Sequence, residues 1–305
     1  MNVSVVIPTY NDAEYIKSAL QSVQSSAVAE IIVIDDNSTD TTISTLKNEQ
    51  LVSNFTLLEN VQNSGPSVSR NKGIVAAKSK WIAFLDGDDY WLPKRLEKMI
   101  AMVEQNPSID IVFSDALIEQ DGAMTDTRQS SLMPIPESTD NIREYLFKRN
   151  CINMCAVLIK TSLAKKILFD ETLRSAEDYD FWIRVAATNS VFKYTSEPLV
   201  VYRKYGKSLS DRRLHSIAAT LSVLKKNEEL ARTELARENL ALHRISLYEE
   251  QLHLAEDKNL ILKSLREIRN LRQLGKRERI LQSIAQHTSS LSELARNILI
   301  REGKS

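Results

Sequence analysis

Histidine is absent from the first two thirds of this 305-residue sequence. The histidines lie only in the C-terminal region, at His215, His243, His253 and His287. The first 210 residues therefore cannot supply a Ser-His-Asp triad, a Cys-His pair or histidine-bound zinc by themselves. If chemistry resides there, carboxylates are the side chains left to carry it.

Cysteine is also scarce. Cys151 and Cys155 are the only two, and no second pair accompanies their C-x3-C spacing, so the pattern matches a zinc site poorly. A reducing compartment argues against a structural disulfide. We expect two buried thiols.

Long apolar runs are missing as well. Stretches such as Trp81–Leu85 and Cys155–Ile159 fall far short of the roughly 18 residues that a membrane-spanning helix needs. The N-terminus has the pattern of a strand and lacks the charged and apolar regions of a signal peptide. These absences predict a cytoplasmic protein.

Turn-forming residues become rare after about residue 205. All seven prolines precede residue 199, and Gly275 is the only glycine between Gly206 and Gly303. The change predicts two parts, residues 1–210 and residues 211–305. The charge also differs between these parts. The first part has 22 Lys+Arg and 27 Asp+Glu, and the second has 18 Lys+Arg and 13 Asp+Glu. The overall net charge of zero gives no indication of nucleic-acid binding.

Within residues 1–210, short apolar segments alternate with helical spacings. Strands are expected at 3–7, 31–34, 55–58, 81–85, 109–113 and 156–159, and helices at 13–25, 66–78 and 92–104. Continuous apolar strands separated by helices predict an α/β protein with a mainly parallel sheet flanked by helices. Gly122, Pro134 and Pro136 mark residues 115–150 as a long, mobile connection.

Residues 212–302 have a helical pattern throughout, with one break expected near Gly275. No heptad repeat persists over four turns, so helical hairpins or a small bundle are expected rather than a long coiled coil. The last helix, at residues 280–298, is amphipathic. It is flanked by Lys276, Arg277, Arg279, Arg296 and Arg301. Two interpretations stay open, namely docking on the rest of the protein and contact with a membrane surface or a partner.

Two polar clusters follow the first two predicted strands, at the sheet edge where open α/β proteins bind ligands. The first, Pro8–Asp12, contains no glycine, which sets aside dinucleotide-binding Rossmann enzymes and P-loop NTPases. An aromatic and polar loop of this kind suits a base and a ribose better than a phosphate. The second cluster is Asp35–Asp40.

A third cluster, Asp86–Asp89, places three carboxylates within four residues after another apolar strand. These carboxylates repel one another unless a counter-charge is present, and oxygen ligands suit Mg²⁺ or Mn²⁺. The sequence therefore predicts a metal site. As an alternative, Asp88 or Asp89 caps the following helix.

Glu177 and Asp178 come about 90 residues after the third cluster, at the expected start of a helix. The helix dipole favours anions there, which is a structural reason for both residues. Because this region has no histidine, a carboxylate at this position is also the best candidate for a general base.

Together these segments resemble glycosyltransferase family 2, whose members share the GT-A fold. The matching residues are Val5–Asn11, Ile34–Ser38, Gly65 with Arg70–Gly73, Phe84–Asp89, Glu177-Asp178 and Tyr202-Arg203. The resemblance covers about residues 1–205 in order. It implies a GT-A catalytic domain followed by an all-helical C-terminal extension.

The resemblance also implies roles for single residues at the donor. Pro8, Thr9 and Tyr10 would line the nucleotide pocket, with Tyr10 near the base. Asp36 would bond the edge of a uracil-type base, and Arg70 would approach the base or the diphosphate.

Three more roles concern the reaction. Asp86 would contact ribose, Asp88 would bind the Mn²⁺ or Mg²⁺ ion that bridges the diphosphate, and Asp178 would deprotonate the acceptor hydroxyl. The implied enzyme is an inverting, metal-dependent hexosyltransferase that uses a nucleotide-sugar donor, expected to be a UDP-sugar. Its acceptor would be a saccharide or a polyprenyl-linked saccharide in surface polysaccharide biosynthesis. The basic tail would contact the inner face of the cell membrane peripherally.

Two features depart from the family pattern. Tyr205 stands where family members often carry a histidine that helps bind metal or diphosphate. The Gln-x-x-Arg-Trp segment and the membrane helices of processive synthases are absent, which favours an enzyme that adds one sugar. Two other functions stay open: an inactive glycosyltransferase-like scaffold and a sugar nucleotidyltransferase, although the latter usually begins with a glycine-rich basic loop.

Overall fold

The computed structural model describes residues 1–50, 54–136, 138–204, 210–255 and 258–274. The chain forms two compact units. The first contains Met1–Ile142 and Asn150–Gly206, and the second contains Arg143–Arg149 together with the chain from Lys207 onward. The short segment Arg143–Arg149 thus groups with the C-terminal helices although the first unit surrounds it in sequence. The assignment of a catalytic domain to residues 1–210 stays a prediction.

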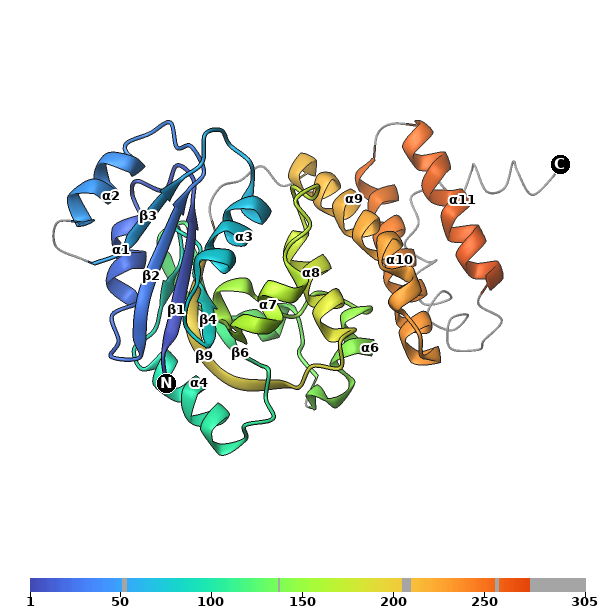
Figure 1. Cartoon of the computed structure of the whole chain (residues 1–305). Helices are drawn as coiled ribbons and strands as arrows, with labels where there is room; N and C mark the ends of the chain where they lie inside the picture. The colour runs from blue at the N-terminus through green and yellow to red at the C-terminus, as the bar shows by residue number, and fades with distance from the viewer. Residues whose placement is uncertain (51–53, 137, 205–209, 256–257, 275–305) are drawn as a thin grey trace. The chain divides into compact units, whose positions relative to one another are not determined.

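The first unit is built on one mixed sheet (Figure 1). Its strands follow the order β3-β2-β1-β4-β8-β6-β9-β5, and β7 pairs with β6. The strands are β1 Val3–Thr9, β2 Val28–Asp35, β3 Thr56–Glu59, β4 Trp81–Phe84, β5 Tyr90–Trp91, β6 Ile111–Gln120, β7 Ala123–Arg128, β8 Val157–Lys160 and β9 Phe192–Lys204. The adjacent strands β3, β2, β1 and β4 run parallel, and β9 runs parallel to β6. The expected α/β class with a largely parallel sheet is confirmed.

Helices cover both faces of this sheet (Figure 1). They are α1 Ile16–Ser22, α2 Thr42–Gln50, α3 Pro66–Ala76, α4 Arg95–Gln105, α5 Gln129–Leu132, α7 Thr161–Ile167 and α8 Glu177–Ala186. Apolar residues of α1, α2 and α4 share one core cluster with Val3, Val5 and Ile7 of β1. All seven residues of β1 are buried. Continuous burial explains why the strand is apolar throughout rather than alternating.

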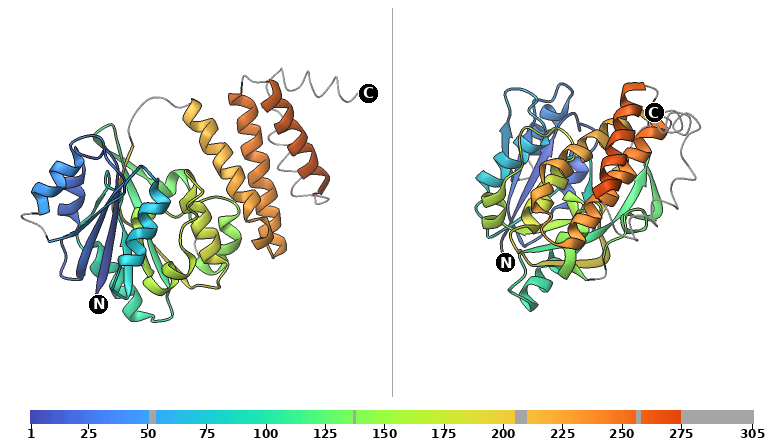
Figure 2. Two further views of the ribbon diagram at one scale, coloured as in Figure 1. Left: turned by 45° about the horizontal axis from the view of Figure 1, so that its top comes forward. Right: turned by 90° about the vertical axis from the view of Figure 1, so that its right-hand side faces the viewer.

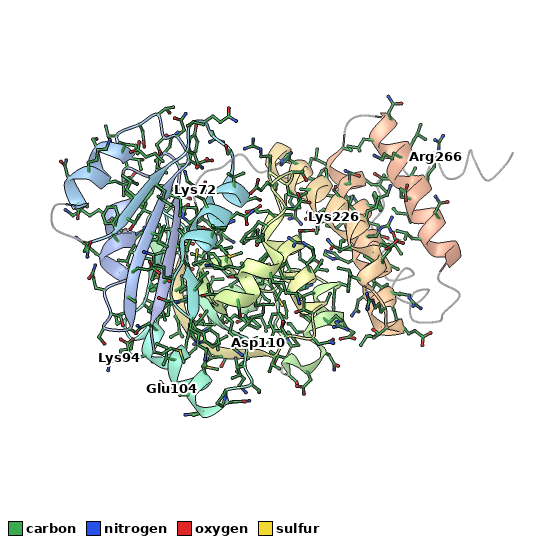
Figure 3. The ribbon with its side chains drawn as sticks, in the orientation of Figure 1. Lys72, Lys94, Glu104, Asp110, Lys226 and Arg266 are labelled. Carbon is green, nitrogen blue, oxygen red and sulfur yellow. The ribbon has the colours of Figure 1, made fainter. Side chains whose placement is uncertain are left out.

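The close packing of α3 on the sheet depends on Gly73. A Cβ atom at this position would lie 2.3 Å from Val6 Cγ1 and 2.9 Å from Ile34 Cδ1. Lys72, labelled in Figure 3, donates hydrogen bonds to the carbonyl oxygen of Glu59 at 2.9 Å and to Asn60 Oδ1 at 3.1 Å. The helix is therefore fixed against β1 and β2 and against the end of β3.

Residues 115–150 contain regular structure, so the prediction of a long connection without strands or helices is wrong. β6 extends to Gln120 and forms a hairpin with β7. Asp121 and Gly122 have φ values of 50° and 81° at the turn between the strands. Two residues with positive φ are typical of a type I′ hairpin turn, for which Asp-Gly is a common sequence.

The second unit contains most of α6, Ile142–Leu146, and three longer helices, α9 Ser210–Lys226, α10 Glu234–Leu254 and α11 Lys258–Leu274. The helix α10 packs beside both α9 and α11 (Figure 2). The expectation of a small bundle is confirmed, but a single break near Gly275 is wrong. The chain already leaves the helical path after Lys226, and α10 begins where Thr233 Oγ1 accepts a hydrogen bond from Ala236 N at 3.1 Å. Apolar periodicity does not detect such a cap.

The predicted final helix at 280–298 and its flanking basic residues lie outside the described residues. Within the part of the chain that the structure describes, no helix is both long enough and apolar enough to cross a bilayer.

Candidate active site

A cavity of about 310 Å³ opens at one edge of the sheet in the first unit. It lies at the carboxyl ends of β1, β2 and β4 and at the N-terminal ends of α3 and α8. Its lining consists of Pro8, Thr9, Tyr10, Asp12, Asp36, Asn63, Gly65, Pro66, Ser69, Arg70, Asp86, Gly87, Asp88 and Glu177. Every residue that the sequence predicts for donor or metal binding is in this set. Asp178 is not.

The loop after β1 packs directly against the acidic loop after β4. The Asp12 carboxylate accepts hydrogen bonds from Thr9 Oγ1 at 2.7 Å and from Tyr10 N at 3.1 Å. A Cβ atom on Gly87 would lie 2.4 Å from Asp12 Oδ2 and 2.7 Å from Thr9 Oγ1. The φ angle of Gly87 is not positive. Glycine is therefore required here by the close approach of the two loops.

Asp36 organises the wall of the cavity formed by residues 60–65. Its Oδ1 accepts hydrogen bonds from Asn60 Nδ2 at 2.8 Å and from Ser64 N at 2.9 Å. Its Oδ2 accepts one from Gly65 N at 2.7 Å. Asp36 is 4% exposed, so these donors compensate the loss of water around the carboxylate.

Arg70 joins three parts of the site. Its Nη2 donates to Asp86 Oδ1 at 2.8 Å, and its Nη1 donates to Glu177 Oε1 at 2.7 Å. The guanidinium is buried, which opposes its charge, but the carboxylates of Asp86 and Glu177 outweigh burial and raise the pKa of Arg70. The residue therefore fixes α3, the acidic loop and the start of α8 to one another as a permanent cation.

Asp88 lies close to other carboxylates, those of Asp86 and Asp12. Burial, followed by the nearby carboxylates of Asp86 and Asp12, raises the pKa of Asp88 to about 7, against the lowering effect of Arg203. Among the described residues, no side chain forms a hydrogen bond or ion pair with the Asp88 carboxylate. Burial also raises the pKa of Asp12, and Asp86 and Asp40 add to the effect. Negative charge at this end of the cavity is thus poorly compensated by protein groups.

Asp89 has a different position and ties the acidic loop to β9. Its Oδ1 accepts a hydrogen bond from Arg203 N at 2.8 Å, and Arg203 Nη1 donates to the carbonyl oxygen of Asp88 at 2.9 Å. Arg203 Nε also donates to Glu119 Oε1 at 2.9 Å. The helix α4 begins only at Arg95 and has no side-chain cap. The alternative in which Asp88 or Asp89 caps that helix is therefore wrong.

The two cysteines are buried free thiols, as expected. Cys155 Sγ accepts a hydrogen bond from Asp86 N at 3.2 Å. Ligand atoms of Asp86, Asp89 and Cys155 lie within 4.8 Å of one another in the described part of the chain. Burial raises the pKa of the Cys155 thiol well above its usual range, and Asp86 and Asp89 contribute further, so this sulfur stays protonated and is a poor ligand.

The carboxylates at this end of the cavity fit a hard divalent cation. Asp86 and Asp88 line the cavity, whereas Asp89 and Cys155 are buried and are not part of its lining. Asp89 Oδ2 is buried and has no hydrogen-bond partner among the described residues. Oxygen ligands with excess negative charge are the set that Mg²⁺ or Mn²⁺ selects.

Asp178 lies in the first turn of α8, next to Glu177. Its Oδ2 accepts a hydrogen bond from Asn150 Nδ2 at 2.9 Å, and its Oδ1 accepts one from Tyr179 N at 2.7 Å. Burial and the charge of Glu177 raise the pKa of Asp178 to about 6, although Arg70 and both hydrogen bonds lower it. A carboxylate with this pKa is ionised at neutral pH and can still accept a proton.

Sequence reasoning did not assign functions to several residues of the site. Asp12 is part of the polar loop after β1 and was recognisable as a further carboxylate there. The ion pair between Glu177 and Arg70 joins two of the segments that carry the family resemblance. The spacing of these residues in the sequence does not predict the pair. No local sequence pattern marks Asn150 as a site residue. None marks Glu119, which accepts a hydrogen bond from Arg203. Tyr205 lies outside the described residues.

Comparisons with known proteins give a consistent result. The family model described as "Glycosyl transferase family 2" matches residues 4–167. The chain is similar to an uncharacterised glycosyltransferase of Methanocaldococcus jannaschii, with 34% identity over 207 residues, which are 66% of this chain and 70% of the relative. It is also similar to the amylovoran biosynthesis glycosyltransferase AmsB of Erwinia amylovora, with 31% identity over 232 residues, or 72% and 75% of the two chains.

Two solved structures have a similar fold. S. aureus TarS 1–349 in complex with UDP-GlcNAc matches with a TM-score of 0.60 and 19% identity, over 89% of this chain and 79% of that chain. The mannosyltransferase PcManGT of Pyrobaculum calidifontis, in complex with GDP-Man and Mn²⁺, matches with a TM-score of 0.63 and 14% identity, over 99% and 79%. At these identities the likeness concerns the fold, and the predicted GT-A fold is confirmed.

Proposed function

We propose that this chain, which belongs to glycosyl transferase family 2, moves one sugar from a nucleoside diphosphate sugar to an acceptor hydroxyl with inversion at the anomeric carbon. The observation that carries the proposal is the distribution of carboxylates. Asp86 and Asp88 line the cavity, whereas Asp178 lies in the first turn of α8, next to Glu177 and outside that lining. One group would serve the donor and the other the acceptor.

The cavity would hold the nucleotide with its base near Tyr10, whose side chain is 43% exposed and free to stack. Asp36 Oδ2 accepts one described hydrogen bond, so a second lone pair can receive the imide N–H of uracil. Arg70 holds Asp86 Oδ1, which leaves Asp86 Oδ2 to accept from a ribose hydroxyl. These features favour a UDP-sugar, the class of donor bound in the S. aureus structure.

Asp88, with Asp86 beside it, would hold a Mn²⁺ or Mg²⁺ ion. When bound, such an ion neutralises charge that develops on the departing nucleoside diphosphate. The support is the crowding of carboxylates at the cavity and the Mn²⁺ ion in the P. calidifontis structure. Arg70 would add positive charge behind the diphosphate while its two terminal nitrogens stay bound to Asp86 and Glu177.

Asp178 would act as the general base. Its carboxylate would take the proton of the acceptor hydroxyl as that oxygen attacks the anomeric carbon. The bond from this carbon to the β-phosphate oxygen breaks in the same step, and the nucleoside diphosphate leaves with the electron pair. The result is one displacement with inversion.

The acceptor would be a saccharide or a lipid-linked saccharide of a surface polysaccharide. AmsB, one of the relatives, is named for the biosynthesis of amylovoran. The basic residues near 276–301 would bring the chain to an anionic membrane where such acceptors reside. Flotation of the full chain with vesicles of anionic lipid tests this, and a K276E/R277E/R279E variant that floats equally well would contradict it.

The proposal is tested by nucleoside diphosphate release from a panel of UDP-sugars and GDP-sugars, with Mn²⁺ and with excess EDTA. We expect release that needs the metal and is lost in D88N and D178N. The control is E104Q, at an exposed position on α4 labelled in Figure 3. Release that persists in excess EDTA would contradict the metal role. Failure to bind any of these nucleotides would favour the scaffold alternative.

A further inference from the structure

The candidate base receives its only described side-chain hydrogen bond from a residue 28 positions earlier. Asn150 Nδ2 donates to Asp178 Oδ2 at 2.9 Å. The orientation of the Asn150 amide is set independently, because its Oδ1 accepts a hydrogen bond from Ile152 N at 3.3 Å. With the oxygen committed to a backbone donor, the NH₂ group must face the carboxylate.

We propose that Asn150 is a positioning residue that aims the Asp178 carboxylate at the acceptor hydroxyl. The inference rests on the proposed role of Asp178 as base.

The charges around Asp178 give the positioning a measurable consequence. Glu177 lies beside it in α8, and Arg70 of α3, which is paired with Glu177, acts on it through its charge. Glu177 raises the pKa of Asp178, whereas Arg70 and the Asn150 hydrogen bond lower it. Loss of the Asn150 donor therefore leaves the carboxylate harder to ionise. Because a base must be ionised, the acid limb of the rate profile would move to higher pH.

The experiment compares N150A and N150D with the wild type for kcat, donor KM and the pH profile of kcat. A hydrogen bond to a charged group supports a loss in kcat of about 10- to 100-fold for N150A. N150D keeps the shape but adds a negative charge, so we expect a larger loss and a larger shift of the acid limb. Donor KM and the affinity for UDP with Mn²⁺ should stay at wild-type values, because Asn150 does not line the donor cavity.

Two outcomes separate this inference from the proposed function. Wild-type activity of D178N would contradict the role of Asp178 itself. Loss of activity in D178N, together with a wild-type kcat and acid limb in N150A, would overturn the positioning role alone. In the D178N background, N150A should cause no further loss, because the group that it positions is already gone.

Discussion

Asp88 and Asp178 are the same residue type under similar burial, but their neighbours differ. The pKa of each is raised, to about 7 for Asp88 and about 6 for Asp178, with burial as the leading cause in both. Asp88 has the carboxylates of Asp86 and Asp12 nearby and no described side-chain donor. Asp178 has one carboxylate neighbour and receives two hydrogen bonds. The first environment calls for a cation, and the second leaves a carboxylate that can exchange a proton.

Arg70 connects these two environments and fixes the distance between them. Its two terminal nitrogens bond to Asp86 on the donor side and to Glu177 on α8. One buried cation thus fixes the spacing between the acidic loop and the helix that carries Asp178. The difference shows that a carboxylate cluster acquires its chemistry from its charged neighbours rather than from its residue type.

The largest effect should come from removing the base. D178N should lower kcat by about 1000-fold, in line with the usual contribution of general base catalysis. The amide keeps the size of the side chain, so UDP binding with Mn²⁺ should not change. Stopped assays of UDP release measure the first quantity, and calorimetric titration measures the second. A kcat within the error of the wild type would remove Asp178 from the mechanism.

The next effect concerns the cation side. D88N removes a charge that a metal ion would balance, so kcat/KM at a fixed Mn²⁺ concentration should fall on the order of 100-fold. The Mn²⁺ concentration for half-maximal rate should rise in D88N but not in D178N. Rates measured across a Mn²⁺ series give both values, with E104Q as the matched control. An unchanged Mn²⁺ series in D88N would assign the ion to other residues.

A smaller effect should follow from the contact between the two donor-side loops. G87A would place a Cβ atom 2.4 Å from Asp12 Oδ2, so the loops must separate and donor affinity should fall about tenfold, with about 1–3 kcal/mol lost from stability. G73A meets Val6 and Ile34 in the core instead. It should lose similar stability with normal UDP affinity in the folded fraction. Urea unfolding and UDP titration separate the two variants, and equal UDP affinities would contradict this account of Gly87.

The smallest effect is a pH dependence of stability without metal. Burial and neighbouring carboxylates raise the pKa of Asp88 in the folded chain above the usual aspartate value, and they raise that of Asp89 as well. The folded state therefore binds more protons, and the free energy of unfolding should fall by about 1 kcal/mol as pH rises from about 5 to about 8. Urea unfolding in EDTA measures this. Saturating Mn²⁺ or the D88N substitution should flatten the curve, and a rise in stability over this range would contradict it.

The cavity that we propose for the donor was predictable from sequence because a general rule places its residues. Parallel strands bring their carboxyl ends to one edge, so polar residues after β1, β2 and β4 had to converge, and Thr9, Asp36 and Asp88 do line one cavity. Asp121-Gly122 is a common type I′ hairpin sequence, but Gly122 considered alone indicates only a loop.

The rest depends on contacts between distant segments. Asn150 donates to Asp178 Oδ2 across 28 positions of sequence. Asp89 meets the backbone of Arg203 across 114 positions of sequence. Apolar periodicity describes local structure and carries no information about such pairs. The ends of α9 and α10 were missed for a related reason, since caps such as Thr233 are set by single hydrogen bonds.

The division of labour between Asp88 and Asp178 is tested most directly by titrating UDP into D88N and D178N, each with and without Mn²⁺. The account predicts that D178N binds UDP more tightly when Mn²⁺ is present, as the wild type does, and that D88N loses this gain. Equal Mn²⁺ dependence in both variants, or its loss in D178N alone, would contradict the assignment of the cation to Asp88 and of the proton to Asp178.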